Sequence, residues 1–181
     1  MLTPDNYTMS NYEDIEDTRQ LNELSNEELV LKQKEGKPEG ARYCFLSNLN
    51  DNDWANGLGE LIEELNKNIE NNKDIKVIQA TLQALQDTIL YDNVAETKDV
   101  INDFIKLRSL ALQSGKYREN SYKQQISIIL LLDALARHYI KYSFGDNFDD
   151  ESECLHLSHM LANVIIIRYQ INTYYNKEVL L

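Results

Sequence analysis

The sequence is poor in the residues that make turns and cross-links. Its 181 residues include two prolines, six glycines and two cysteines. An all-β chain needs frequent turns, so this shortage argues against one and favours helices. Cys44 and Cys154 form no C-x-x-C pair. With no secretory leader before them, they indicate a reduced, cytoplasmic setting.

Long apolar runs and the common catalytic motifs are also missing. No run approaches the roughly 20 residues of a membrane span, because residues 126–142 are interrupted by Asp133 and by Arg137 and His138. There is no glycine-rich phosphate loop, no G-x-S-x-G and no Cys/His nucleophile pair. We therefore expect no membrane span, no cofactor and no catalytic residue. Enzymatic activity has no positive support at this stage.

Acidic residues dominate the charge, which is −12 overall. Residues 1–30 carry eight acids against one base, whereas residues 101–145 carry seven bases against three acids. This sign argues against direct binding to nucleic acid, and the asymmetry favours a protein partner with a basic surface, such as one that handles nucleic acid. The acids predicted to bind it are Glu13, Asp14, Glu16, Asp17, Asp146, Asp149, Asp150 and Glu151.

Apolar periodicity predicts a single all-α domain over residues 1–181, with residues 1–13 flexible. The stretch 126–142 is apolar on almost every side, which is typical of a central helix covered by others. Residues 155–169 are its natural partner. We expect a compact antiparallel bundle of about five long helices, with one or two short ones at its N-terminal edge. Their approximate ranges are 54–69, 75–89, 95–114, 121–145 and 150–176, the last capped by Asp150 and Glu153.

One acid, Asp133, falls inside the central apolar helix. A buried charge is tolerated only when it is paired. We therefore predict that Asp133 bonds Arg168 on the last helix or Arg137 one turn along its own. His138, near the end of the central helix, is interpreted as a side chain whose charge suits the helix dipole.

The sequence contains one candidate metal motif. Glu153 and His156 form an E-x-x-H pair, and His159 follows three residues later. Di-metal carboxylate bundles use such pairs on two helices, but this sequence has one pair only. Glu153, His156 and His159 are thus the residues that a metal would use, although we expect none.

Three functions remain open from the sequence. The leading hypothesis is a small acidic helical protein that binds another macromolecule as an inhibitor, immunity factor or regulator. Richness in Asn, Ile, Lys and Tyr is typical of AT-rich bacteria, phages or large viruses. The alternatives are a metal-dependent helical-bundle enzyme using the E-x-x-H motif and a structural subunit, including a homo-oligomer.

Overall fold

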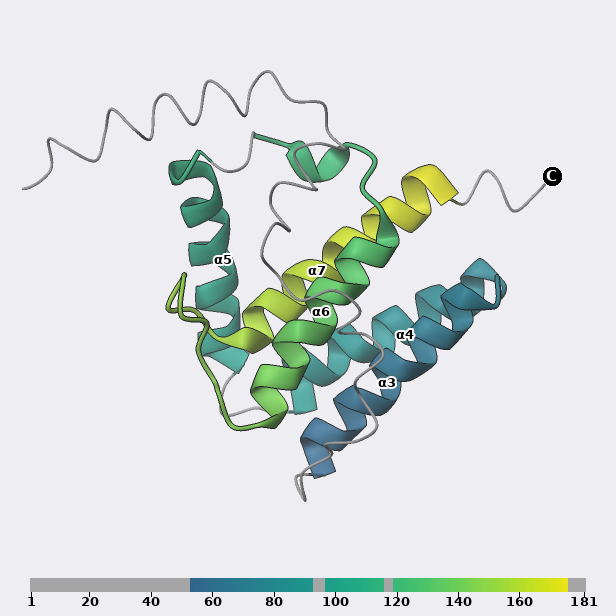
Figure 1. Ribbon diagram of the computed structural model, residues 1–181, viewed down its shortest axis with the longest axis horizontal. Helices are drawn as coiled ribbons and strands as arrows, with labels where there is room; N and C mark the ends of the chain where they lie inside the picture. Colours follow the sequence, from purple (N-terminus) through teal and green to yellow (C-terminus); the bar gives the residue numbers. More distant parts are fainter. Residues whose placement is uncertain (1–52, 93–96, 116–118, 176–181) are drawn as a thin grey trace, which may run out of the picture.

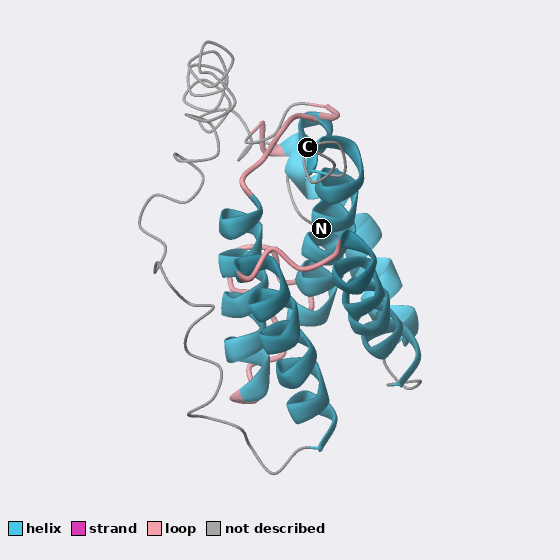
Figure 2. Cartoon of the chain, turned by 90° about the vertical axis from the view of Figure 1, so that its right-hand side faces the viewer, coloured by secondary structure: helices cyan, strands magenta, loops and turns pink. Residues whose placement is uncertain are grey.

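The protein is all-helical in the part that the structure describes. The computed structural model describes residues 53–92, 97–115 and 119–175. Glu13, Asp14, Glu16 and Asp17, the expected short N-terminal helices and the flexible residues 1–13 lie outside these ranges. Figure 2 shows helices and loops without a strand in the described part, which confirms the predicted class. The α-helices are α3 (Asp53–Glu70), α4 (Ile75–Asp87), α5 (Thr97–Gln113), α6 (Ile128–Ser143) and α7 (His156–Gln170).

Helices α6 and α7 form the antiparallel centre of the molecule (Figure 1). α7 also packs against α4 and α5, and α6 packs against α3. The predicted central helix is therefore confirmed, although Ile129 in its first turn is exposed. The apolar core of the pair consists of Leu131, Leu132, Leu135, Ala136, Leu157, Met160, Leu161, Val164 and Ile167. None of the described helices has the length and apolar character to cross a bilayer.

Two helix starts differ from the prediction. Residues Ser121–Lys123 form a 3-10 turn, and α6 begins at Ile128 rather than near Ser121. The reason is Gln170 of α7, which is fully buried. Its amide donates to the carbonyls of Tyr122 and Gln124, both at 2.8 Å, and accepts from the Ile126 N–H at 2.9 Å. These bonds satisfy backbone groups that a longer helix would have used internally.

Helix α7 also starts later than the sequence predicts. Glu153 has a φ of 54° and lies in the loop, so the helix begins only at His156. The predicted C-terminal ends of α5 and α6 agree with the structure better than the predicted helix starts do. Gly145 has a φ of 86° just after α6, and Gly115 has a φ of 66° just after α5. Glycine adopts this left-handed conformation without the steric cost that a Cβ brings.

The predicted pairing of Asp133 with Arg168 is wrong. Arg168 Nη1 donates instead to Gln86 Oε1 at 2.5 Å, which links α7 to α4. Asp133 is buried, and its Oδ1 has no hydrogen-bond partner among the described residues. Burial lowers the pKa of Arg137, while the charge of Asp133 acts in the opposite direction. The electrostatic neighbour of Asp133 is thus Arg137 on its own helix.

A close approach between α3 and α6 explains one glycine. Gly59 is buried, and a Cβ there would lie 2.7 Å from Cζ of Tyr139 and closer still to its hydroxyl. Gly57 lies two residues earlier on α3, and a Cβ there would have nothing within 4 Å. The absence of a side chain at residue 59 therefore lets the buried Tyr139 ring lie against the α3 backbone.

We expect opposite effects of alanine at the two glycines. Gly59→Ala should lower the free energy of unfolding by about 1–3 kcal/mol, because the added methyl forces Tyr139 out of its position. Gly57→Ala should raise it by about 0.5–1 kcal/mol, because alanine is the better helix former. Urea unfolding of both variants measures the difference. Equal stability of the two would contradict the close contact.

Candidate metal centre

All three histidines of the chain meet at one end of the α6–α7 pair. Because the helices are antiparallel, the last turns of α6 lie beside the first turn of α7. This brings His138 onto His159, with stacked rings 4.2 Å apart and 11° between their planes. His138 Nδ1 also lies 2.9 Å from His156 Nδ1. His138 was expected only to interact with the helix dipole, and the structure instead places it in a cluster.

The loop between the two helices supplies a carboxylate to this cluster. Its backbone closes on itself, with the Asp149 N–H bonded to the Cys154 carbonyl and the Glu153 N–H bonded to the Asp149 carbonyl, both at 2.8 Å. Asp149 Oδ2 accepts from the N–H and hydroxyl of Ser152, at 3.1 and 3.0 Å. The same oxygen lies 3.6 Å from His159 Nε2. The loop therefore turns Asp149 inward, towards the histidines.

His138, Asp149 and His159 have the geometry of a candidate metal site. One ligand atom from each lies within 4.8 Å of the other two. Two atoms bonded to one ion at about 2.1 Å can be at most about 4.2 Å apart. The three ligand atoms are thus close enough to share an ion only after small side-chain rotations, because the His138 and His159 rings are stacked and their in-plane lone pairs must turn towards a common point. The Ser152 hydroxyl, 2.8 Å from His159 Nε2, is the group that would have to give way.

The charges at the site suit a cation. Burial lowers the pKa of His156 and outweighs the carboxylates of Asp146 and Asp149, so this ring is neutral at pH 7. Burial alone would raise the pKa of Asp149. The positive charge of His159 and the Ser152 hydrogen bonds outweigh it and bring that pKa below its usual value. A cation bound by His159 would displace the proton of that ring, because a metal-bound imidazole must be neutral, and would take over its role in keeping Asp149 ionised.

The residues of the predicted E-x-x-H motif divide between loop and helix. Glu153 is an exposed loop residue and takes no part in the cluster, whereas His156 and His159 lie next to His138. Sequence reasoning therefore found two of the three histidines and missed His138 and Asp149. One signal did exist, since His138 lies near the end of one apolar helix and Asp149 lies in the loop that leads to the next.

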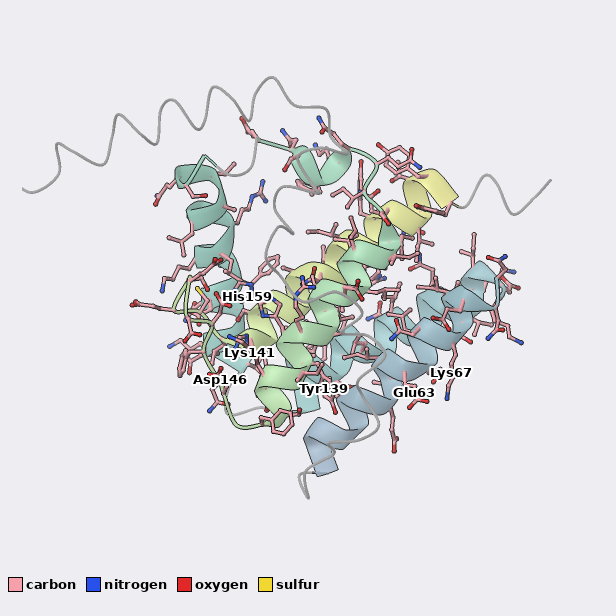
Figure 3. The ribbon with its side chains drawn as sticks, viewed as in Figure 1. Glu63, Lys67, Tyr139, Lys141, Asp146 and His159 are labelled. Carbon is pink, nitrogen blue, oxygen red and sulfur yellow. The ribbon has the colours of Figure 1, made fainter. Side chains whose placement is uncertain are left out.

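The loop acids predicted to bind a partner have different surroundings. Asp149 is turned inward, and Asp146 Oδ2 lies 3.6 Å from His156 Nε2. Asp150 and Glu151 are exposed, and Lys141 lies 3.3 Å from Asp150 and 3.9 Å from Asp146. Figure 3 shows Lys141, Asp146 and His159 at this end of the pair. Binding of a basic partner by these acids stays a prediction.

A pocket lies between α5 and the same loop. It has a volume of about 430 Å³ and is lined by Asp99, Asn102, Asp103, Asn147, Phe148 and Leu155. The Asp103 carboxylate also accepts the Leu155 N–H at 2.8 Å, which fixes the loop to α5. The described residues of its lining include two carboxylates and no base, which suits a phosphate group poorly.

Comparison with known families points to this part of the chain. The model of a family described as dATP/dGTP diphosphohydrolase, N-terminal, matches residues 108–178. This range is less than half of the chain, and it contains α6, the loop and α7 with all the residues of the cluster. No curated protein and no solved structure matches the chain. Residues 108–178 thus resemble an enzyme-related helical domain, which favours the enzyme alternative over the binding protein.

The loop geometry predicts an unreactive thiol at Cys154. The side chain is fully buried, and burial raises its pKa. The thiolate is the reactive form, so at a given pH less of it is present than in an ordinary cysteine. In a Cys44→Ser variant, alkylation by iodoacetamide should be more than about tenfold slower than in a model peptide, and its midpoint should lie at a higher pH than that of the peptide. Peptide-like kinetics in the folded protein would contradict this, and unfolding in guanidinium should restore them.

Proposed function

We propose that the α6–α7 pair and its loop form a metal-dependent phosphohydrolase domain that acts on purine deoxynucleotides such as dATP and dGTP. One observation carries the proposal. Three side chains that could together hold a divalent cation, His138, Asp149 and His159, converge inside the range that the diphosphohydrolase family model matches.

The ligand types indicate which metal to expect. Two imidazoles and one carboxylate suit Mn²⁺, Fe²⁺, Co²⁺ or Zn²⁺, whereas Mg²⁺ prefers oxygen ligands throughout. Three protein ligands leave coordination positions open, as in catalytic rather than structural sites. A cation held there would neutralise phosphate charge and lower the pKa of an attacking water.

The chain itself offers a phosphate-binding group beside the cluster. Lys141 is partly exposed, and its pairs with Asp150 and Asp146 are surface pairs of the kind that contribute about 0–1 kcal/mol. Its ammonium can therefore turn from these carboxylates to a nucleotide phosphate at little cost. In the hydrolysis, the water oxygen bonds to phosphorus and loses a proton to solvent. The P–O bond to the departing phosphate breaks, and that phosphate keeps the bonding electron pair.

The positions of the loop acids support this function over capture of a basic partner. Of the four acids that were predicted to form a binding face, Asp149 and Asp146 point towards histidines. Asp150 and Glu151 are exposed and lie clear of the cluster, whereas Asp146 is exposed but lies beside His156. With Asp149 turned inward, less negative charge remains to steer a charged partner.

The decisive experiment measures metal and hydrolysis together. We expect the protein, purified without a histidine tag, to bind about one equivalent of Mn²⁺ or Zn²⁺ per chain and to hydrolyse dATP or dGTP in the presence of that metal. His159→Ala and Asp149→Asn should abolish both, because each removes a ligand. Asp150→Ala, in the same loop, is the matched control and should keep both. Metal analysis and chromatography of the nucleotide products give the readings.

Two results would contradict the proposal. One is a wild-type protein that binds none of these cations at millimolar concentration. The other is hydrolysis that survives in both ligand variants, because the activity would then belong to another site or to a contaminating enzyme.

A further inference from the structure

The three candidate ligands do not account for the surroundings of His156. Its side chain is fully buried, yet its Nε2 has no hydrogen-bond partner among the described residues. A buried polar group without a partner lowers stability by the full cost of its desolvation. The other ring nitrogen, Nδ1, lies 2.9 Å from His138 Nδ1. A carboxylate oxygen, Asp146 Oδ2, lies 3.6 Å from the unpartnered Nε2.

The contacts alone fit either tautomer, and the proposed cation on His138 decides between them. Nδ1 of His138 faces His156, so Nε2 is the His138 atom left to bind a cation, and it must carry a lone pair. A neutral imidazole with its lone pair on Nε2 has its proton on Nδ1. His138 Nδ1 therefore donates, and His156 Nδ1 accepts. The proton of His156 then lies on Nε2, the atom that faces Asp146.

We infer that Asp146 and His156 are positioning residues that hold His138 in the ring orientation and tautomer needed to bind the cation. This inference rests on the proposed metal centre. The relay would run from the Asp146 carboxylate through His156 to His138, and every donor would meet an acceptor along it once Asp146 closes on His156. Metal-binding histidines generally donate their second nitrogen to such a partner, whose loss weakens metal affinity by about 10–100-fold. Here the carboxylate acts through an intervening imidazole.

The 3.6 Å separation between His156 Nε2 and Asp146 Oδ2 must shorten for the relay to close. A hydrogen bond between Nε2 and Oδ2 needs about 2.7–3.2 Å, so Asp146 must approach His156 by roughly half an ångström. Asp146 lies in the first residues of the loop after α6, and 47% of its side-chain surface is exposed. Ligand binding at Asp149, three residues further along, would draw the same loop towards the histidines.

Asp146 and Asp150 provide a matched pair for the test. Both are exposed loop aspartates, and both lie within 4 Å of Lys141 Nζ. Asp146 alone of the two lies beside His156. Asp146→Ala and Asp150→Ala therefore remove the same charge and a contact with the same lysine, but only the first removes the acceptor for the relay.

Calorimetric titration of the metal-free full-length protein with Zn²⁺ and Mn²⁺ tests the inference. We expect Asp146→Ala to weaken binding by about 10–100-fold and Asp150→Ala to stay within about twofold of wild type. Equal affinities in all three proteins would overturn the relay and leave the metal centre standing. A wild-type protein that binds neither cation would overturn both, so the two failures are distinguishable.

The tautomers give a second reading that does not depend on affinity. The chain has only three histidines, so long-range ¹H–¹⁵N spectra of histidine-labelled, Zn²⁺-loaded protein contain three ring systems. We expect His138 to be protonated on Nδ1 and His156 on Nε2. His156→Gln assigns its signals. Asp146→Ala should shift the His156 Nε2 resonance, whereas Asp150→Ala should not. A His156 ring protonated on Nδ1 would overturn the inference.

Discussion

The antiparallel packing of α6 against α7 is the constraint on which the rest of the structure depends. It buries the largest part of the apolar core and sets the register between the end of one helix and the start of the other. A slip of one helical turn would move His138 by about 5.4 Å relative to His159 and would separate the candidate ligands. The packing of these apolar residues thus sets the positions of the polar side chains in the cluster, although the apolar residues supply no ligand atom. Stability and site geometry are coupled here, because the same side chains provide both.

Two buried polar side chains secure the two ends of α7. Gln170 near its C-terminal end holds the extended segment before α6 through three hydrogen bonds, and His156 at its N-terminal end contacts His138. Both side chains are fully buried, so an unmet hydrogen bond at either carries the full cost of desolvation. At Gln170 each of the bonds found is to backbone. At His156, Nε2 has no hydrogen-bond partner among the described residues, and the nearest carboxylate oxygen, Asp146 Oδ2, lies 3.6 Å away.

Sequence patterns predicted the helical class, the central helix and the glycine stops, because apolar periodicity and the conformational freedom of glycine act locally. They failed where a distant side chain decides the local backbone. Gln170 delays the start of α6 by donating to the Tyr122 carbonyl, which lies 48 residues earlier in the chain. No pattern near Ser121 could reveal this contact. Arg168 likewise bonds Gln86 rather than Asp133, since partner choice depends on how helices are rotated. The cluster was only half found because Asp149 comes from an aperiodic loop and His138 from another helix.

The candidate site lies in one short segment of the chain, and this affects how the site forms during folding. Every residue of the candidate cluster and of its relay falls within residues 138–159, which form one contiguous hairpin. Closing so short a loop costs little entropy, so the site can assemble early in folding. An ion bound there would act as a cross-link across the hairpin and would favour the folded state by mass action. Among the described residues, all the candidate ligands thus come from one short segment, and Asp103 of α5 holds that segment from outside by accepting the Leu155 N–H.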